Sequence, residues 1–198
     1  MARGGILERG ASAGLARLYH DLRHRRERFR QFLGVALAIA IAFAGSPTRA
    51  LLLSGVLPFV AGVLIRMWAS GHVKKDKELA TDGPYAFVRH PLYVGNILIL
   101  LAFCLASGSW WAWVAAALLL AAFYPPAISQ EDGKLRRLFG ENWELWRAEV
   151  RALLPRLTPF QPGRSAQWSF GQSLMRNGEP IIAAFLSILM FVMYMKLD

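Results

Sequence analysis

Long runs without a charged residue alternate along this chain with short, strongly charged segments. Uncharged and mainly apolar runs cover residues 31–48, 50–65 and 180–195, and a longer one covers 91–130. About 20 apolar residues in a helix cross the roughly 30 Å of bilayer hydrocarbon. The sequence Ser-Gly-Ser at 107–109 interrupts the longest run near its middle. The pattern therefore predicts five membrane-spanning helices, two of which form a tight helical hairpin.

Strand-like alternation of apolar and polar residues is missing from the sequence, and no repeat or linker divides it. A chain of 198 residues is sized for one domain. The sequence therefore predicts an all-α integral membrane helical bundle, a single membrane domain over 1–198. Its expected parts are an interfacial basic helix (1–30), a four-span core (31–130), a cytoplasmic helix with its connector (131–177) and a final span (178–198).

Two segments outside the apolar runs have helical periodicity. Between residues 12 and 32, apolar residues recur near helical spacing among arginines. This is typical of a basic amphipathic helix in the lipid head-group layer; the alternative is a solvated helix that only enforces the topology. The segment 131–154 predicts a second amphipathic helix outside the membrane, broken in two at Gly140. The proline-containing segment 155–177 predicts an irregular connection to the final span.

The chain is strongly basic, with 23 Lys and Arg against 13 Asp and Glu and a formal net charge of +10. Such an excess can indicate nucleic-acid binding, but its distribution indicates membrane topology instead. All Lys and Arg residues except Arg49 and Lys196 lie in 1–30, 66–90 and 131–176. By the positive-inside rule these segments are cytoplasmic. We therefore expect no nucleic-acid partner and a multi-pass membrane protein (of the inner membrane if bacterial), with its N-terminus in the cytoplasm and its C-terminus outside.

Several familiar kinds of site have no support in the sequence. The single cysteine, Cys104, lies in an apolar run without a partner, so a disulfide or a cysteine metal site within one chain is excluded. No Gly-rich phosphate loop, Cys/His cluster or nucleophilic serine elbow is present. The common soluble nucleotide-binding folds are therefore not indicated, and no metal is expected.

The segment 83–95, GPYAFVRHPLYVG, is the chemically densest part of the chain. Gly83 and Pro84 predict a turn, and Pro91 is tolerated in the first turn of a helix. Arg89 and His90 then lie beside the N-terminus of the third span, at the cytoplasmic face. Unpaired N–H groups and the helix dipole make such an end favourable for anions. We expect a carboxylate or phosphate to bind here.

Glu131 and Asp132 are the first charged residues after the predicted hairpin, which returns the chain to the same membrane face. We expect this pair to neighbour Arg89 and His90. A basic, anion-binding mouth that faces paired carboxylates would suit a zwitterionic ligand such as an amino acid. The alternative from the residues alone is an interfacial salt bridge, for example between Arg89 and Glu131.

The motif GPYAFVRHPLYVG, followed about forty residues later by EDGKLRRLFGENWELWRAEVRALLP, resembles the isoprenylcysteine carboxyl methyltransferase and phospholipid methyltransferase superfamily of integral membrane methyltransferases. The resemblance covers about residues 64–155 and includes Arg66. The chain departs from the family pattern at Asp132, where glutamate is usual, and at Trp143 and Trp146, where tyrosines are common. These aromatic residues keep a stacking face but lose a hydroxyl group.

The resemblance implies that S-adenosylmethionine binds at the cytoplasmic side and that a lipophilic or prenylated substrate arrives sideways through the bilayer. Arg89 and His90 would contact the methionine carboxylate of the cofactor, and Glu131 would pair with its amino group. The implied cofactor-binding residues are Tyr85, Arg89, His90, Pro91, Tyr93, Gly95, Glu131 and Asp132. The implied catalytic residues are Arg151 and Glu131, and the implied substrate-binding residues are Arg66, Trp143, Trp146 and Arg151.

Several alternatives stay open at this point. Carboxyl O-methylation and amine N-methylation are both compatible with the resemblance. Sterol reductases have a similar fold and motif but bind NADPH, whose phosphates could use Arg89, Lys74 and Lys75. A non-catalytic membrane protein, in which the charges only set the topology, is the third hypothesis. Arg66 itself could equally be an interfacial residue that extends to the head groups.

Overall fold

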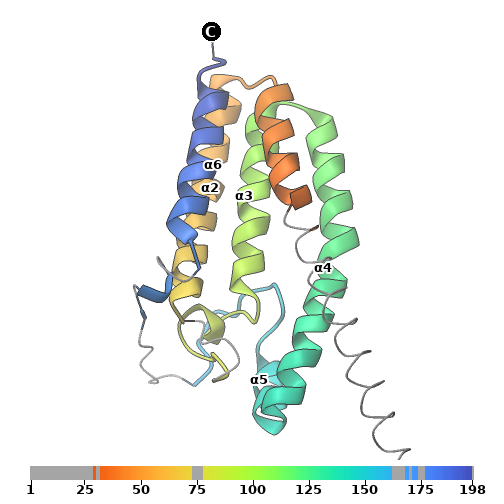
Figure 1. The fold of residues 1–198 in the computed structure, drawn as a ribbon, viewed down its shortest axis with the longest axis vertical. Coiled ribbons are helices and arrows are strands. Elements are labelled where there is room, and N and C mark those ends of the chain that lie inside the picture. The colour runs from red at the N-terminus through yellow and green to blue at the C-terminus, as the bar shows by residue number, and fades with distance from the viewer. Residues whose placement is uncertain are drawn as a thin grey trace, which may run out of the picture. The chain divides into compact units, whose positions relative to one another are not determined.

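The structure is a computed structural model that describes residues 29, 32–72, 78–161, 168, 169, 171–173 and 177–197. The chain divides into two compact units, residues 1–37 and 38–198, and the second contains every helix labelled in Figure 1. Most of the basic amphipathic helix predicted between residues 12 and 32 lies outside the described residues, as do Lys74 and Lys75. The predicted single domain therefore stays a prediction.

Every regular element in the described part of the chain is a helix, which confirms the predicted all-α class there. A helix over Phe32–Ala44 is followed by α2 (Arg49–His72), the 3-10 turn η1 (Gly83–Ala86), α3 (Pro91–Ser107), α4 (Trp110–Phe139), α5 (Glu141–Glu149) and α6 (Glu179–Tyr194). Each of the five predicted spans is thus a helix. Among the described helices, α2 and α4 alone are long and apolar enough to cross a membrane, whereas the three shorter apolar helices (Phe32–Ala44, α3 and α6) have 10–17 residues. The number of crossings stays a prediction.

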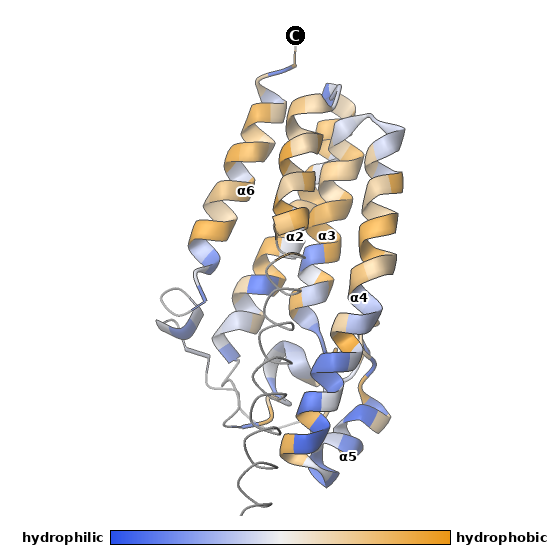
Figure 2. Cartoon of the chain, turned by 45° about the vertical axis from the view of Figure 1, so that its right-hand side comes forward, coloured by the Kyte–Doolittle hydropathy of each residue, from blue (hydrophilic) through white to orange (hydrophobic). Residues whose placement is uncertain are grey.

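The apolar helices expose most of their side chains. Only 17% of the most apolar stretch of α2 and 11% of that of α4 is buried, and Leu57 and Leu118 are 78% and 66% exposed. Figure 2 shows hydrophobic residues along the upper parts of α2, α3, α4 and α6, and hydrophilic residues on α5 and the lower end of α4. Contiguous apolar surface of this kind is unfavourable in water. It indicates a protein embedded in lipid.

Glycines on α2 and α3 allow these two helices to pack backbone against backbone. A Cβ atom added to Gly62 would lie 2.8 Å from the carbonyl oxygen of Gly95, and one added to Gly55 would lie 2.7 Å from that of Ala102. Close approach of this kind is a main source of helix association in membranes, because lipid tails are as apolar as the side chains. The start of α3 is therefore held firmly against α2.

The helical hairpin predicted at 107–109 joins α3 to α4. Gly108 ends α3 in the left-handed conformation, with a φ of 63°, which glycine adopts without the usual steric cost. A Cβ atom at Gly108 would also come within 2.6 Å of the carbonyl oxygen of Ser46. The backbone N–H of Ser46 donates to the carbonyl of Ser107 at 2.8 Å. This end of the bundle is thus closed by direct backbone contact.

The structure differs from the prediction along α4. No helix boundary falls at Gln130: α4 continues to Phe139, so Glu131 and Asp132 are interior residues of the helix that also carries the apolar stretch. Charged residues such as Glu, Lys and Arg have good helix propensity, so a change from apolar to charged sequence need not end a helix. The break predicted at Gly140 is present and separates α4 from α5.

Helix α5 packs against η1 through aromatic residues. The indole N–H of Trp146 donates to the carbonyl oxygen of Tyr85 at 3.1 Å. The buried cluster around this bond consists of Ala69, Tyr85, Trp143, Trp146 and Val150. Because the cluster joins α2, η1 and α5, it fixes the turn that leads into α3.

Candidate functional site

The Arg89-His90-Pro91 motif forms the start of α3. His90 is the N-cap residue and Pro91 is the first residue of the helix, where the missing N–H of proline costs nothing. The backbone N–H of Arg89 donates to the carbonyl of Arg151 at 2.9 Å, and that of His90 donates to the carbonyl of Ala152 at 3.1 Å. The motif is therefore held between its own helix and the segment that follows α5.

Residues 155–160 extend this contact, although the sequence predicted only an irregular connection there. The backbone N–H of Arg156 donates to the carbonyl of Phe87, and that of Phe160 donates to the carbonyl of Ala86, both at 2.9 Å. These bonds supply partners for backbone groups that lie in no helix, which is a requirement for any buried turn. The segment thus helps to set the backbone in front of Arg89 and His90.

Four charged residues meet where α3 begins, and we call them the α3–α4 cluster: Arg89, His90, Glu131 and Asp132. His90 Nε2 is 3.1 Å from Asp132 Oδ1, and His90 Nδ1 is 3.6 Å from Glu131 Oε2. Arg89 Nη1 is 3.2 Å from Asp132 Oδ2. The structure brings the two predicted pairs together. The salt bridge expected as the alternative is also present, with Asp132 instead of Glu131 as the partner of Arg89.

Burial and ion pairing act in opposite directions on these cations. His90 is only 4% exposed, and burial lowers the pKa of His90. The hydrogen bonds and negative charges of Asp132 and Glu131 outweigh burial, so the pKa of His90 is raised above its ordinary value. For Arg89, burial lowers the pKa, Asp132 opposes the shift and Arg147 adds to it, and the pKa is lowered overall. A further negative charge beside Arg89 would therefore be favourable.

Three buried donors at this site have no hydrogen-bond acceptor within the described part of the chain: Nε and Nη1 of Arg89 and Nε1 of Trp143. Arg89 Nη1 is close enough to Asp132 for an ion pair, but its N–H is not aligned with the carboxylate oxygen. The Arg89 guanidinium also lies 6.0 Å from the centre of the Trp143 ring. Unsatisfied buried donors are costly, and a carboxylate matches the guanidinium fork. This donor set fits the carboxylate of a ligand.

Aromatic residues support the α3–α4 cluster from the helices around it. The ring of Tyr93 stacks on that of His90, with centroids 5.4 Å apart, and contacts the ring of Tyr124 on α4 at 5.2 Å. Pro91 is fully buried. Burial, followed by the negative charges of Glu131 and Glu179, raises the pKa of the Tyr85 phenol. Tyr85 is therefore a neutral hydrogen-bond donor at physiological pH.

The other residues implied by the resemblance are not members of the α3–α4 cluster. Gly95 faces α2, where an added Cβ atom would meet Cγ of Arg66 at 2.6 Å and the carbonyl oxygen of Gly62 at 2.8 Å. The structure thus places Gly95 in the helix contact. Arg151 is exposed, and its carbonyl group is the part that contacts the motif. Trp143 and Trp146 belong to the buried aromatic cluster.

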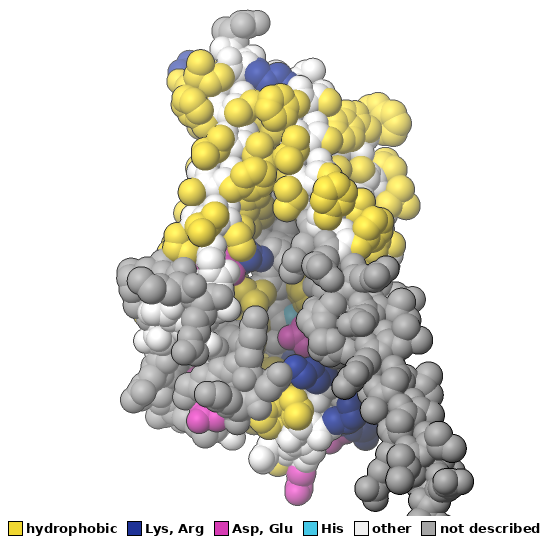
Figure 3. Space-filling model, in the orientation of Figure 1, with side chains coloured by type: hydrophobic (Ala, Val, Ile, Leu, Met, Phe, Trp, Pro, Cys, Tyr) yellow, Lys and Arg dark blue, Asp and Glu magenta, His cyan; other side chains and the backbone are white. Residues whose placement is uncertain are grey.

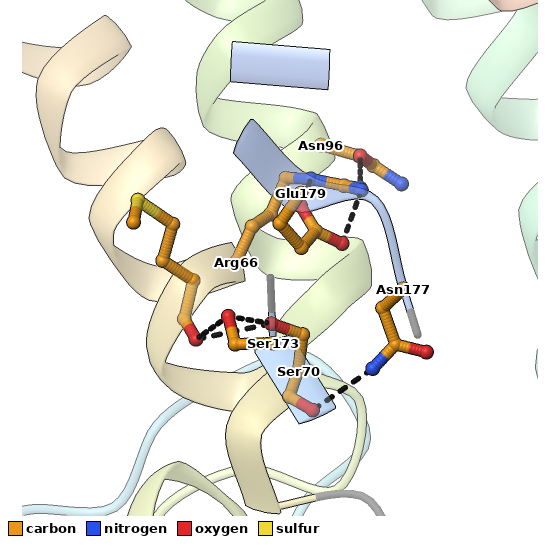
Figure 4. Close-up of polar contacts among 7 residues, drawn as sticks. Arg66, Ser70, Asn96, Ser173, Asn177 and Glu179 are labelled. Carbon is orange, nitrogen blue, oxygen red and sulfur yellow. Dashed lines mark hydrogen bonds and ion pairs between the residues drawn. The ribbon is translucent and has the colours of Figure 1, made fainter. Parts of the chain in front are cut away.

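Arg66 belongs to a second set of polar residues, which we call the α2–α6 cluster: Arg66, Asn96 and Glu179. Arg66 donates from Nε and Nη2 to the two oxygens of Glu179, at 3.0 and 2.8 Å, and from Nη1 to the side-chain oxygen of Asn96. Figure 4 shows the three side chains converging from α2, α3 and α6. Sequence reasoning missed Asn96 and Glu179. The available signal was Glu179 as the last charged residue before the final apolar run.

The connector ahead of α6 is attached to the same end of α2. The hydroxyls of Ser70 and Ser173 are 2.7 Å apart, and the amide of Asn177 donates to the carbonyl of Ser70 at 2.9 Å, as drawn in Figure 4. In Figure 3, basic and acidic side chains come to the surface directly below the hydrophobic band. The polar residues thus gather at the end of the bundle opposite the Gly108 hairpin.

Comparison with known proteins matches the part of the chain that contains the site to a protein family. The family model described as phospholipid methyltransferase matches residues 64–142, a range that contains Arg66, η1, all of α3 and the acidic pair. A protein-S-isoprenylcysteine O-methyltransferase of Schizosaccharomyces pombe is 36% identical over 81 residues, which is 41% of this chain and 34% of that protein. No solved structure matches the chain.

Two bacterial relatives carry names from metal resistance. The cobalt-zinc-cadmium resistance protein CzcN of Cupriavidus metallidurans is 32% identical over 174 residues, covering 83% of this chain and 80% of that protein. The nickel-cobalt-cadmium resistance protein NccN of Alcaligenes xylosoxydans xylosoxydans is 34% identical over 116 residues, covering 58% of this chain. The match spans about half the length of NccN, 54%. The similarity thus extends beyond the range that the family model covers.

Proposed function

Because this chain belongs to the isoprenylcysteine carboxyl methyltransferase and phospholipid methyltransferase superfamily, we propose that it transfers a methyl group from S-adenosylmethionine to a lipophilic acceptor. The reaction takes place at the cytoplasmic membrane face. The observation that carries the proposal is the α3–α4 cluster, in which Arg89, the buried His90 and two carboxylates meet at one helix N-terminus.

The α3–α4 cluster fits the zwitterionic amino-acid end of the cofactor. Arg89 offers two buried N–H donors without an acceptor in the described residues, and His90, with its raised pKa, offers a second positive charge. Glu131 is 48% exposed at its side chain and can accept hydrogen bonds from an ammonium group. The charges pair with one another in the free protein, so ligand binding exchanges internal ion pairs for pairs with the ligand. The internal ion pairs hold the side chains of Arg89 and His90 in position before the ligand binds.

The cofactor supplies an electrophilic methyl group on a sulfonium cation. The acceptor's lone pair forms a bond to this carbon as the carbon–sulfur bond breaks, and the electron pair goes to sulfur. Residues of this chain would hold the two reactants about 3 to 3.5 Å apart and exclude water. An amine acceptor must also lose a proton, and Glu131, Asp132 or His90 could accept it. Oxygen and nitrogen acceptors both fit this scheme.

Direct titration of the purified full chain in detergent tests the assignment. We expect isothermal titration calorimetry to detect S-adenosylmethionine and S-adenosylhomocysteine at micromolar concentrations, with no binding of NADPH. Glu131→Gln and His90→Ala should each weaken the affinity about 10-fold or more, since each removes a charge-assisted hydrogen bond worth about 1.5–3 kcal/mol. Glu144→Gln, in an exposed ion pair with Arg136, is the matched control. Binding of NADPH alone would replace the methyltransferase by the reductase-like alternative.

CzcN and NccN are named for metal resistance. Their names point to metal tolerance as the cellular process that methyl transfer by this chain would serve. Among the described residues, no group of three or more His, Cys, Asp or Glu side chains is arranged to hold a metal ion. Expression of the chain in a metal-sensitive bacterial strain would test the context. If methyl transfer underlies tolerance to cobalt, zinc or cadmium, growth should improve with the wild-type chain and not with His90→Ala.

A further inference from the structure

Three of the apolar helices are short between their polar ends. Sixteen uncharged residues separate Arg49 from Arg66 on α2, and another sixteen separate Glu179, the first residue of α6, from Lys196. Helix α3 has 17 residues in all. At a rise of about 1.5 Å per residue, each of these stretches is about 24–26 Å long. Each is therefore several ångströms shorter than the roughly 30 Å of bilayer hydrocarbon, and any tilt shortens its height further.

The short stretches of α2 and α3 lie at the same height in the bundle. Two glycines of α2, seven residues apart, face two α3 positions that are also seven residues apart: Gly62 faces Gly95, and Gly55 faces Ala102. This antiparallel register places Arg66 level with Pro91, the first residue of α3, and Arg49 level with Gly108, just past its end. Figure 2 shows the hydrophobic residues of α2, α3, α4 and α6 over a common range of height.

The charged side chains at the two ends of α6 are bonded to other parts of the protein. Lys196 Nζ donates to the carbonyl oxygen of Phe43 at 2.9 Å and to that of Gly45. Both oxygens of Glu179 accept from Arg66, at 3.0 and 2.8 Å. Extension of flanking side chains to the head groups is one way for a short helix to fit a thicker bilayer. Because these side chains are already bonded within the protein, that adjustment is closed to α6.

Aromatic side chains mark the same height on α4. Trp110, the first residue of α4, is 78% exposed, and Trp68 near the other end of α2 is 44% exposed. The rings of Tyr93 and Tyr124 are in contact at 5.2 Å, so Tyr124 lies level with the start of α3. Fourteen apolar residues of α4 precede Tyr124, a length of about 21 Å. Trp and Tyr are enriched at membrane interfaces, so the apolar part of α4 is also short.

We call these four stretches the apolar belt: 50–65 of α2, α3, 110–123 of α4 and 180–195, which begins in α6. We propose that the apolar belt, about 24 Å tall, thins the bilayer around the protein, so that its lipid partners are phospholipids with shortened tails. A belt shorter than the hydrocarbon is matched by thinning, by extension of flanking side chains or by oligomerisation. The second way is closed at α6. The proposal concerns the lipid surface and does not depend on methyl transfer.

Thinning would place the lipid head groups at the level of the α3–α4 cluster. Arg89 and His90 lie at the start of α3, which is the edge of the apolar belt. In Figure 3, charged side chains come to the surface directly below the hydrophobic band. In a bilayer of full thickness, such charges would lie closer to the hydrocarbon, where they are costly. The thinned bilayer keeps the cluster in the head-group layer and within reach of water.

The extension of the lipid tails gives the direct test. The full chain is reconstituted in phosphatidylcholine vesicles whose monounsaturated tails have fourteen, eighteen or twenty-two carbons, and deuterium NMR of labelled tails reports their mean extension. With rising protein content, we expect the extension to fall in the two longer lipids and to change least in the fourteen-carbon lipid. A constant or increased extension in the longest lipid would overturn the proposal.

Thermal unfolding in the same vesicles, followed by tryptophan fluorescence, measures how well the protein fits each lipid. We expect the highest midpoint in the fourteen-carbon lipid and a fall of about 2–4 °C for each step to longer tails, as a modest cost of mismatch gives for a protein of this length. Chemical cross-linking reports the oligomeric state. Association that grows with tail length, while the tail extension stays constant, would reject thinning in favour of oligomerisation.

Two exposed isoleucines of α6 provide a matched pair of depth probes. Ile181 is 76% exposed near the start of α6, and Ile188 is 60% exposed near its middle. In a thinned eighteen-carbon bilayer, Ile181→Lys places its ammonium group close to the head groups, whereas Ile188→Lys places it deep in hydrocarbon. We expect the first variant to lower the unfolding midpoint clearly less than the second. Leu157→Lys, at a residue 99% exposed outside the belt, should leave the midpoint unchanged. Equal losses for the two isoleucine variants would contradict a thinned bilayer at Ile181.

Discussion

Each of the two charged clusters of this bundle pairs an arginine with a carboxylate, but the two arginines differ in how many of their N–H groups have an acceptor. In the α2–α6 cluster, every nitrogen of the Arg66 guanidinium donates to Glu179 or Asn96. In the α3–α4 cluster, Nε and Nη1 of Arg89 have no acceptor in the described residues. A self-satisfied arginine stabilises the helix arrangement around it, whereas an incompletely satisfied one is prepared for a ligand. Loss of Arg66 should therefore affect folding most, and loss of Arg89 should affect binding most.

The largest expected effect follows from Arg66→Met. This change leaves Glu179 buried, charged and without its bidentate partner, which costs about 3–5 kcal/mol of folding free energy. Thermal unfolding of the full chain in detergent should show a strongly lowered midpoint. The double variant Arg66→Met/Glu179→Leu should recover most of the loss, because it removes both charges. A single variant as stable as the wild type would mean that Glu179 finds another partner or reaches water.

A smaller effect is expected for Arg89→Met, and it should appear in ligand affinity. Loss of charge-assisted hydrogen bonds worth about 1.5–3 kcal/mol should weaken S-adenosylmethionine binding about 10- to 100-fold. The thermal midpoint should change less than for Arg66→Met, because Arg89 is incompletely paired in the free protein. Arg136→Met, at a residue whose side chain is 68% exposed, is the matched control. Unchanged affinity would remove Arg89 from the binding site.

The smallest expected effect is the pH dependence contributed by His90. Its pKa in the folded protein is raised above the ordinary value because Asp132 and Glu131 outweigh the effect of burial. The stabilisation from these contacts is thus fully present below the unfolded-state pKa of about 6.5, and it is lost as pH rises through the folded-state pKa. The unfolding midpoint should fall over this range relative to that of His90→Gln. An identical pH profile for both proteins would contradict the ion pairing.

Much of the architecture follows from local sequence signals. The prediction of five apolar helices rests on the absence of charge in four runs of sequence. The hairpin at 107–109 and the break at Gly140 rest on glycine, whose effect is local. The neighbourhood of His90 and Glu131 also follows, because a two-helix hairpin returns the chain to the face where it started. The boundary predicted at Gln130 is wrong, because it was placed at the change from apolar to charged residues, whereas helix propensity is nearly the same on both sides of that residue.

The sequence by itself determined the apolar helices, the basic motif at the start of α3 and the acidic pair that meets it. Tertiary structure alone decided that Asp132 joins Arg89 to His90, and that residues 155–160 support the motif through backbone hydrogen bonds. It also decided that Arg66 pairs with Glu179, 113 residues away. Such pairings depend on which helix faces pack together. In a bilayer, small residues and buried polar groups select those faces, and periodicity within one segment carries no information about its partner.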